Sequence, residues 1–344
     1  MNEPVTNNAD TSSPDTLGVL LVNLGTPDSP EPRDVRRYLK EFLWDPRVVE
    51  LARPLWWLVL NLVILNTRPR RSAAAYAKVW TAAGSPLLVI SKQLQQALQH
   101  ELDGHSGAPV RVALAMRYGN PSIAAGLEEL RAAGARRVLV ISLYPQYSAT
   151  TTAANYDGVA GALRHWRALP ELRFVNDYHE HPLYIRALAD SVRRYQAEHG
   201  EPDRLLLSFH GIPQEYAAAG DPYPQQCYRT ADLLVAELGL AADRWQLSFQ
   251  SRLGPKQWLQ PYTDQTLEKL AGEGVGSVQV MCPGFSADCL ETLEEIAMEN
   301  RDVFMGAGGK HYGYIPCLND HASHVELFAS LIGQHLQGWM QTET

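Results

Sequence analysis

The chain has 344 residues, of which 45% are hydrophobic and 20% are charged, as expected for a globular protein large enough for two domains. Its formal net charge of −8 excludes a generally basic surface and argues against nucleic acid as a partner. Its four cysteines form no C-x-x-C pair, which argues against a structural zinc or iron–sulfur site.

The first 16 residues are polar and carry no export signal of basic and then apolar residues. We therefore expect residues 1–16 to form a disordered tail, and the protein to lie in the cytoplasm with reduced thiols. After this tail, short apolar runs alternate with longer amphipathic stretches.

The apolar runs predict strands and the amphipathic stretches predict helices. The predicted strands are 19–23, 110–116, 137–143, 172–175, 205–208, 246–249, 278–281 and 312–315. The main predicted helices are 122–133, 151–166, 182–198, 228–238, 263–271, 288–301 and 321–336. Such alternation is typical of parallel sheets with crossover helices, and eight strands fit two Rossmann-like halves better than one sheet.

The predicted fold is therefore α/β, with two Rossmann-like lobes, each a parallel sheet flanked by helices, facing each other across a cleft. We place the lobes at 17–168 and 169–318, and a C-terminal helix at 319–344 that packs back on the first lobe. An internal repeat supports this division, because segments 145–149 and 283–287 both read Pro-x-aromatic-Ser-Ala after a predicted strand. The serine of each segment is a candidate helix N-cap.

The turn at 23–27 has the character of a backbone-donor turn for an anion, but it is not a dinucleotide fingerprint. Residues 55–65 form the most apolar stretch, which is shorter than the roughly 20 residues that span a bilayer. Two readings of this stretch remain. It is either a half-buried helix or an interfacial element on a membrane, assisted by its tryptophans and the basic run 68–71.

Two predicted strand ends and one loop carry candidate functional side chains. His210 closes the strand at 205–208, and an imidazole there can accept a proton from a weakly acidic N–H near neutral pH. Arg117 and Tyr118 follow the strand at 110–116 and are expected at the same cleft. Trp258 lies in a loop, where it either anchors packing or stacks on a planar aromatic ligand.

The helix predicted after Ser286 carries acidic residues at steps of three and four, which place Asp288, Glu291, Glu295 and Glu299 on one face. One reading is a solvated face with an acidic residue near the helix start. The other is a path for a hydrated divalent cation, which would pass through because no His/Cys cage surrounds it.

The ordered motifs of the chain resemble those of ferrochelatases, which insert ferrous iron into a porphyrin. The resemblance runs from about residue 18 to the C-terminal helix and rests on seven motifs, LVNLGTP at 21–27, GSPL at 84–87, MRYG at 116–119, YPQYS at 144–148, SFHGIP at 208–213, GDPYP at 220–224 and SADCLET at 286–292. It implies a chelatase-like fold, and Fe²⁺ and protoporphyrin IX as substrates that give protohaem and two protons. The alternatives are a chelatase for coproporphyrin III or a cobalt substrate, and a non-catalytic tetrapyrrole-binding protein.

Site residues follow from the resemblance position by position. It implies that His210 is the active-site histidine and Glu291 the catalytic glutamate, and that both contact the metal together with Asp288 and Glu295. It also implies an apolar lip at about 38–65 that touches the inner membrane and admits the porphyrin. The residues that it assigns to porphyrin binding are Tyr76, Arg117, Tyr118, Trp258, Phe42 and Leu43.

Two departures from the family pattern concern sulfur. Animal members hold an iron–sulfur cluster with a cysteine after the Pro-Gln-Tyr-Ser motif and three more in a C-terminal extension. Ala149 stands at the first position here and the sequence ends at Thr344, so neither a cluster nor another permanently bound cofactor is expected. Cys289 stands where some relatives carry histidine, so the metal path is expected to differ in its softer ligands.

Overall fold

A computed structural model describes residues 16–104 and 109–339, so the expected tail at 1–16 lies almost entirely outside the described residues. The described strands form two four-stranded parallel sheets. The first has the order β2-β1-β3-β4 and consists of β1 (Leu17–Thr26), β2 (Val110–Gly119), β3 (Arg137–Ser142) and β4 (Glu171–Val175). The second has the order β6-β5-β7-β8 and consists of β5 (Arg204–His210), β6 (Trp245–Gln250), β7 (Ser277–Met281) and β8 (His311–Ile315).

All eight predicted strands are confirmed, and so are the two Rossmann-like lobes. The central strands β1 and β5 are nearly continuous apolar runs because helices cover both faces of each sheet. The lobes have the same strand order, and their register agrees, since Arg137 pairs with Glu171 in one sheet and Ser277 pairs with His311 in the other. The internal repeat in the sequence therefore corresponds to two lobes with the same strand topology.

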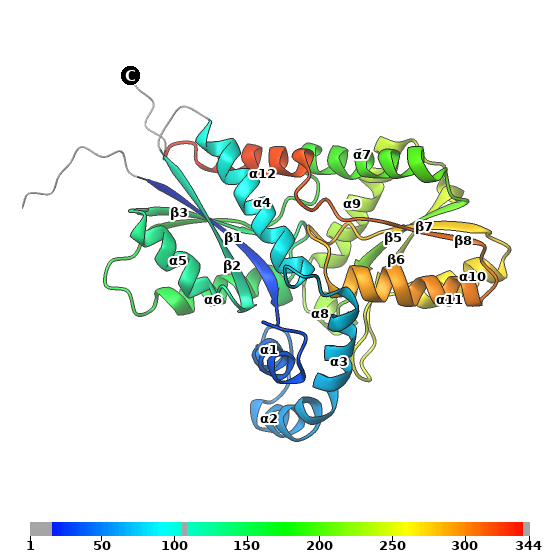
Figure 1. Ribbon diagram of the computed structural model, residues 1–344, viewed down its shortest axis with the longest axis horizontal. Coiled ribbons are helices and arrows are strands. Elements are labelled where there is room, and N and C mark those ends of the chain that lie inside the picture. The colour runs from blue at the N-terminus through cyan, green and yellow to red at the C-terminus, as the bar shows by residue number, and fades with distance from the viewer. Residues whose placement is uncertain (1–15, 105–108, 340–344) are drawn as a thin grey trace, which may run out of the picture.

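Helices flank both sheets (Figure 1). Their bounds are α4 (Pro86–Asp103), α5 (Ile123–Ala132), α6 (Ala154–Leu163), α7 (Pro182–His199), α8 (Gln214–Ala218), α9 (Tyr223–Leu238), η3 (Ala242–Arg244), α10 (Thr263–Gly272), α11 (Arg301–Gly306) and α12 (Ala322–His335). Helix α7 follows the first sheet but packs against α9 of the second lobe, while α12 packs against α4 of the first. Arg137 and Arg173 donate to main-chain oxygens of Trp339 and Gln337, so the segment after α12 lies on the first lobe.

Two helical predictions need correction. The stretch predicted at 288–301 is a π-helix, η4 (Glu291–Asn300), and the stretch predicted at 151–166 begins with a π-helical turn, η2 (Ala149–Ala153). A π-helix closes hydrogen bonds over five residues and is rare outside functional segments, so α-helical spacing does not describe it. Ser148 caps η2 as predicted, with Oγ accepting from the Thr150 N–H at 3.2 Å. Ser286 is no cap, because its hydroxyl pairs with Tyr178 and the helix begins later.

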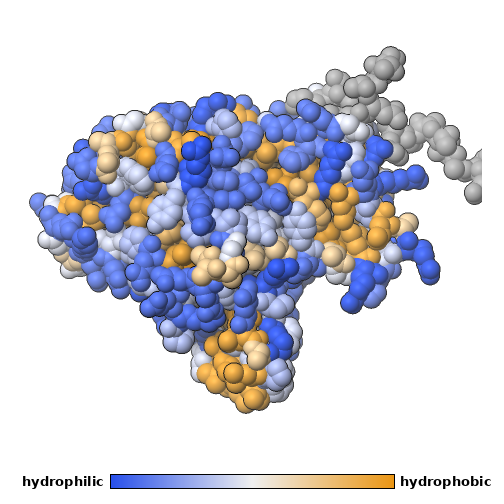
Figure 2. All heavy atoms as spheres, turned by 180° about the vertical axis from the view of Figure 1, so that it is seen from behind, coloured by the Kyte–Doolittle hydropathy of each residue, from blue (hydrophilic) through white to orange (hydrophobic). Residues whose placement is uncertain are grey.

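Between β1 and α4 the chain leaves the first lobe and forms a projection, which we call the lip (residues 32–79; Figure 1). It consists of α1 (Pro32–Trp44), α2 (Arg53–Val59), η1 (Leu60–Ile64) and α3 (Leu65–Val79). Its core is apolar, and its far surface exposes large apolar side chains, namely Leu55, Trp57, Leu58, Leu62 and Val63. Figure 2 shows apolar residues gathered at the tip of this projection. In the described part of the chain, no helix has the length and apolar character needed to traverse a bilayer.

Candidate functional site

His210 lies at the carboxyl end of β5, where a parallel sheet places its functional side chains. Its Nδ1 is 2.6 Å from the main-chain oxygen of Gly211. Because a carbonyl oxygen only accepts, Nδ1 carries the proton and Nε2 keeps its lone pair in the neutral imidazole. The ring packs near Phe285, with 6.3 Å between ring centroids. The residue predicted as a base thus presents its free nitrogen away from the strand backbone.

Glu291 begins η4, which follows β7, and β7 is the neighbour of β5 in the second sheet. Both predicted catalytic residues therefore come from the second lobe, His210 from the end of β5 and Glu291 from the helix that follows the adjacent strand β7. A buried amide joins them, since Gln250 pairs with His210 in the β5–β6 ladder and donates through Nε2 to the carbonyl of Glu291 at 3.2 Å. The structure thus brings the two predicted residues to the same sheet edge.

Glu291 also faces the first lobe. It lines a small cavity of about 10 Å³ together with Cys289 and three residues of the first lobe and lip, Thr26, Tyr38 and Tyr76. A space of this size holds roughly one water molecule. The predicted porphyrin-side residue Tyr76 is therefore placed beside the predicted catalytic glutamate.

Three tyrosines surround this position, of which Tyr38 and Tyr76 are buried and Tyr144 is half-buried. Burial, and then the charge of Glu291, raises the pKa of Tyr76 well above its usual range. Burial is also the main cause of the raised pKa of Tyr38 and of Tyr144, with Glu291 contributing to both. Neutral phenols next to a carboxylate act as hydrogen-bond donors. The sequence prediction did not assign roles to Tyr38 or Tyr144. Tyr144 nevertheless follows the carboxyl end of β3, just as Arg117 lies near the carboxyl end of β2.

Glu295 lies one step further along η4 and is held by a single residue. Its two oxygens accept from the main-chain N–H of Ser251 at 2.8 Å and from the Ser251 hydroxyl at 2.5 Å. Burial raises the pKa of Glu295 to about 7, against the lowering effect of these two bonds. Ser251 has a φ of 62°, a backbone conformation that is rare for serine and that turns both donors toward the carboxylate. Sequence reasoning missed Ser251, because only the folded chain places it near η4.

Asp288 occupies a different environment from Glu291 and Glu295. Its side chain is buried, and it accepts hydrogen bonds from the Thr292 and Tyr314 hydroxyls, the Cys317 N–H and the Asn319 amide. These four donors occupy the lone pairs of the carboxylate. The geometry thus gives Asp288 the environment of an internal brace rather than of an exposed metal ligand.

The remaining acidic residues of η4 point elsewhere. Glu294 pairs with Lys78 of α3, at 2.5 Å between Nζ and Oε1, and this ion pair ties the lip to the second lobe. Glu299 is exposed. The four residues predicted to share one acidic face therefore have three different environments, with Asp288 internally hydrogen-bonded, Glu299 exposed, and Glu291 and Glu295 at the site.

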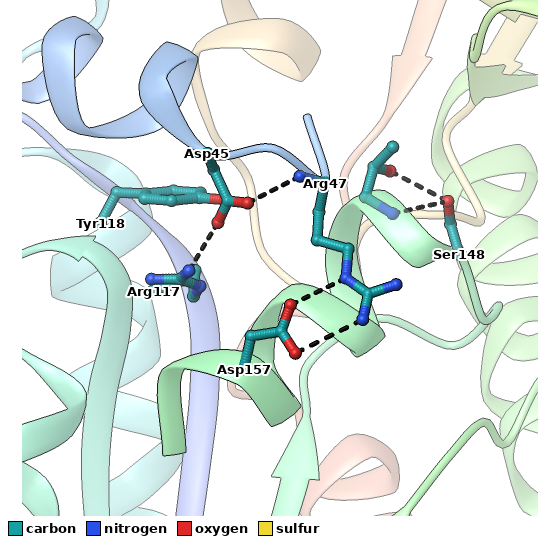
Figure 3. Close-up of polar contacts among 7 residues, drawn as sticks. Asp45, Arg47, Arg117, Tyr118, Ser148 and Asp157 are labelled. Carbon is teal, nitrogen blue, oxygen red and sulfur yellow. Dashed lines mark hydrogen bonds and ion pairs between the residues drawn. The ribbon is translucent and has the colours of Figure 1, made fainter. Parts of the chain in front are cut away.

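The predicted porphyrin-binding residues fall into two groups. Arg117 and Tyr118 both bond to Asp45 at the base of the lip, and Phe42 packs on Tyr118 with ring centroids 5.1 Å apart (Figure 3 shows Asp45, Arg117 and Tyr118). Leu43 differs from these, because it is 2% exposed in the lip core and its carbonyl accepts from the indole of Trp56.

Trp258 is half-buried next to the residue that follows His210. A Cβ added to Gly211 would lie 3.3 Å from the indole, and the indole N–H donates to the carbonyl of Leu253 at 3.1 Å. The indole is thus fixed beside Gly211, the residue that follows His210, and the absence of a side chain at Gly211 makes this approach feasible. This position fits either reading of Trp258 that the sequence left open.

The cysteines near η4 are buried thiols. Burial raises the pKa of Cys289 and of Cys317 well above the usual range, and nearby carboxylates raise it further. Among the residues that the structure describes, no three His, Cys, Asp or Glu side chains are grouped so that they could hold a metal ion. Donors for a cation are thus spread along the site instead of gathered in a cage.

Comparisons with known proteins agree with the geometry. Residues 16–336 match the family model described as ferrochelatase. A ferrochelatase of Thioalkalivibrio sulfidiphilus is 55% identical over 327 residues, 95% of this chain and 89% of the relative. A ferrochelatase of Aromatoleum aromaticum is 53% identical over 330 residues, 96% of this chain and 90% of the relative. A solved structure of SirB from Bacillus subtilis with Fe³⁺ is similar in fold, with a TM-score of 0.54 at 12% identity, covering 93% of this chain and 95% of that one.

Proposed function

The chain belongs to the ferrochelatase family and inserts ferrous iron into a porphyrin in haem biosynthesis, and we propose that His210 and Glu291 transfer the protons in that reaction. A free-base porphyrin carries two N–H groups, and Fe²⁺ replaces both protons when it enters the ring. The enzyme must therefore accept two protons and offer donors to a cation that is losing its water ligands. The single observation that carries this assignment is the placement of His210 at the end of β5 and of Glu291 at the start of η4, which follows the adjacent strand β7, with Gln250 joining the two.

His210 is the proposed acceptor of the pyrrole protons. Its Nδ1 proton is committed to the Gly211 carbonyl, so Nε2 is the basic atom and has a fixed direction. General bases of this kind contribute roughly 10²- to 10⁴-fold to the rate. Trp258 next to it, and Phe42 on the lip, offer aromatic surfaces against which a planar macrocycle can pack.

Glu291 and Glu295 are the proposed route for the cation and for the released protons. Glu291 lies beside the tyrosine cluster, and Glu295 has a pKa near neutrality, so it can gain or lose a proton during turnover. We propose that His210, Glu291 and Glu295 contact the metal on its way to the porphyrin. Asp288 contributes indirectly, because its four internal hydrogen bonds hold the start of η4 in place.

The macrocycle must leave planarity for this chemistry. Its N–H groups point into the ring plane, so a cation approaching from one face meets no lone pair directed at it. We propose that contacts between the lobes and the lip bend the porphyrin and expose nitrogen lone pairs on one side. Such strain draws on binding energy from parts of the substrate remote from the reacting atoms.

The reaction is proposed to need no permanently bound cofactor. The cysteines Cys227, Cys282, Cys289 and Cys317 are all buried and free, and Ala149 stands where the cluster-bearing relatives have a ligand. Iron enters only as the substrate. Metal analysis of the purified protein by mass spectrometry tests this, and stoichiometric iron together with acid-labile sulfide would contradict it.

Peripheral contact with a membrane through the lip is also proposed. Leu55 and Leu62 are 58% and 62% exposed at its tip, and two such leucines in water are unfavourable unless another apolar phase covers them. The basic run 68–71 follows these residues and suits anionic headgroups. A membrane contact at this place would bring an apolar porphyrin directly to the cleft.

The choice of porphyrin is proposed to be protoporphyrin IX. An insertion assay with Zn²⁺, which avoids oxidation, follows the change in the visible spectrum for protoporphyrin IX and for coproporphyrin III. We expect a higher kcat/KM for protoporphyrin IX than for coproporphyrin III, and a higher kcat/KM for coproporphyrin III would contradict the proposal. Running Fe²⁺ and Co²⁺ under reducing conditions checks metal range, since carboxylates and imidazole discriminate poorly among divalent ions.

A further inference from the structure

Asp45 is a buried carboxylate at the end of α1, where the lip chain turns. Its side chain is 4% exposed. The Oδ1 atom accepts a hydrogen bond from the N–H of Arg47 at 2.8 Å, and the Asp45 carbonyl accepts from the N–H groups of Val48 and Val49. Hydrogen bonds within the lip therefore hold Asp45 in place independently of its contacts with the first lobe.

The other oxygen, Oδ2, reaches two side chains at the end of β2 (Figure 3). It accepts from Nη2 of Arg117 at 2.5 Å and from the hydroxyl of Tyr118 at 2.9 Å. Hydrogen bonds between ionised partners are shorter and stronger than neutral ones, and this one is largely screened from water. One oxygen atom of the lip thus sets the direction of a residue predicted to bind the porphyrin.

Asp45 uses only part of the Arg117 guanidinium. Of its three nitrogens, only Nη2 contacts the carboxylate, and the buried Nε has no acceptor among the residues that the structure describes. The side chain runs past Gly158 of α6, where an added Cβ would lie 3.3 Å from Cδ and 3.4 Å from Nε. A guanidinium with unused donors suits a second, substrate-borne carboxylate.

The location of Arg117 agrees with such a role. Burial dominates the pKa of the Tyr144 phenol, Cys289 and Glu291 raise it further, and Arg117 acts in the opposite direction. Arg117 and Glu291 are therefore electrostatic neighbours of the same phenol. Arg117 also precedes Tyr118, which pairs with Gly25 of β1, and Gly25 lines the same small cavity as Glu291.

We propose that Asp45 is a positioning residue, which holds Arg117 in the orientation that directs its remaining donors at a carboxylate of the porphyrin. The inference rests on the proposed function, in which Arg117 binds the substrate, and it adds the residue that orients it. A free arginine side chain loses rotamer entropy when it binds, and a side chain already fixed avoids that loss. Because Asp45 belongs to the base of the lip, the same bond couples the position of the lip to porphyrin binding.

The test compares Asp45→Asn, Arg117→Ala and the double variant with the parent enzyme. Asp45→Asn keeps the shape and one acceptor oxygen but removes the charge. Asp157→Asn is the matched control, because it breaks the neighbouring pair with Arg47 at the base of the lip and does not touch Arg117 (Figure 3). The measurements are kcat and KM for protoporphyrin IX and Zn²⁺, the porphyrin Kd from tryptophan quenching, and the melting temperature.

For Asp45→Asn, the KM and Kd for porphyrin should rise about tenfold, the size expected for one charge-assisted hydrogen bond, while KM for Zn²⁺ stays unchanged. The control should match the parent enzyme. In the Arg117→Ala background, Asp45→Asn should have no further effect on porphyrin affinity, because Arg117 is absent and the oxygen retained at position 45 can still accept from the Tyr118 hydroxyl.

The failures can be told apart. Unchanged porphyrin affinity in Arg117→Ala would mean that Arg117 does not bind the substrate, and the part of the proposed function on which this inference rests would then be wrong. A loss in Arg117→Ala without a loss in Asp45→Asn, or equal losses from Asp45→Asn in both backgrounds, overturns the positioning role alone. If Asp45→Asn does not fold, Arg117→Lys replaces it, since the ammonium of lysine keeps the charge but lacks the rigid planar fork through which Asp45 can fix the direction of the remaining donors, and a parental KM for porphyrin would then overturn the inference.

Discussion

The side-chain amide of Gln250 donates a hydrogen bond to the main-chain carbonyl of Glu291, with nitrogen and oxygen 3.2 Å apart. Gln250 is 2% exposed, and its own oxygen accepts from the hydroxyl of Ser208 at 2.8 Å. Ser208 lies two residues before His210 on β5. A single buried amide therefore connects the strand that carries the proposed base, His210, to the helix that carries Glu291.

Replacing this amide with a thioether of similar size tests the bridge. In Gln250→Met the Glu291 carbonyl loses its donor and η4 can shift, so kcat should fall about tenfold or more while porphyrin Kd stays near the parental value. Stability should fall by about 1–3 kcal/mol, the cost of leaving a buried acceptor unpaired. Steady-state kinetics and urea unfolding measure the two effects.

The matched control for this prediction is Gln279→Met. Gln279 is also a buried glutamine of the second sheet, and its amide donates to the carbonyl of Gly200 at 2.8 Å, at the opposite ends of the strands. Its loss should cost a similar amount of stability with kcat unchanged. Equal loss of kcat in both variants would mean that stability, and not the position of Glu291, limits the activity of Gln250→Met.

Removal of the imidazole at position 210 is the direct test of the base. His210→Ala should reduce kcat by roughly 10²- to 10⁴-fold, the usual contribution of a general base, while porphyrin still binds. His100→Ala, an exposed histidine on α4, is the control and should behave like the parent enzyme. Turnover of Zn²⁺ and porphyrin at the parental rate in His210→Ala would remove the histidine from the mechanism.

Gly25 offers a stability prediction that does not depend on catalysis. Its φ is 111°, and a Cβ placed there would lie 1.8 Å from the main-chain oxygen of Tyr118, so no side-chain rotation can relieve the clash. Gly25→Ala should separate β1 from β2 and abolish soluble expression or lower Tm by many degrees. Gly161→Ala, in an α-helix with open space around it, should instead stabilise by about 0.5–1 kcal/mol.

The sequence predicted the strands and the place of the site because both depend on local patterns. Apolar runs such as that of β5 are long enough to identify buried strands. Because the carboxyl ends of parallel strands meet at one edge of a sheet, the sequence also predicted that His210 and Glu291 lie near each other. Tyr144 also follows the carboxyl end of a strand, β3, so the same argument predicts that it lies at the site.

The other features depend on contacts that no local pattern reports. Asp288 lies three residues before Glu291 and Glu295 lies four residues after it, so α-helical spacing predicts one shared face. Yet Asp288 accepts from four internal donors, and Glu295 is held by Ser251 from a distant loop. The π-helical geometry of η4 was not predictable, because residue periodicity alone does not distinguish it from an α-helix. Leu43 lies next to Phe42 in sequence but points into the lip core.

The exposed tip of the lip gives a prediction about membranes. Leu62→Glu places a charge on the most exposed leucine of this surface and should reduce sedimentation with vesicles that contain anionic lipid at least several-fold. Turnover of a water-soluble porphyrin should not change, because Leu62 is 62% exposed and does not line the cavity beside Glu291. Leu169→Glu is the control, since Leu169 is 66% exposed but lies outside the lip. Equal vesicle binding by both variants would contradict a contact through the lip.

Glu295 predicts how stability depends on pH. Its pKa in the folded chain is about 7, above the ordinary value of 4.5, so between these pH values the folded state binds more protons than the unfolded state. The contribution of this group is therefore fully present below pH 4.5 and is lost as the pH rises through 7, which makes the free energy of unfolding fall over that window.

Two variants separate this group from the others. Glu295→Gln is uncharged throughout and should show a smaller fall in unfolding free energy between pH 5 and 8 than the parent chain, measured by urea unfolding at unit steps of pH. Ser251→Ala removes the hydroxyl bond that lowers the pKa of Glu295, so its fall should move to higher pH. Glu299→Gln, at an exposed position of the same helix, is the control. If Glu295→Gln and the parent show the same pH profile, another residue titrates in this range, and Glu295 is ionised throughout turnover and relays no proton.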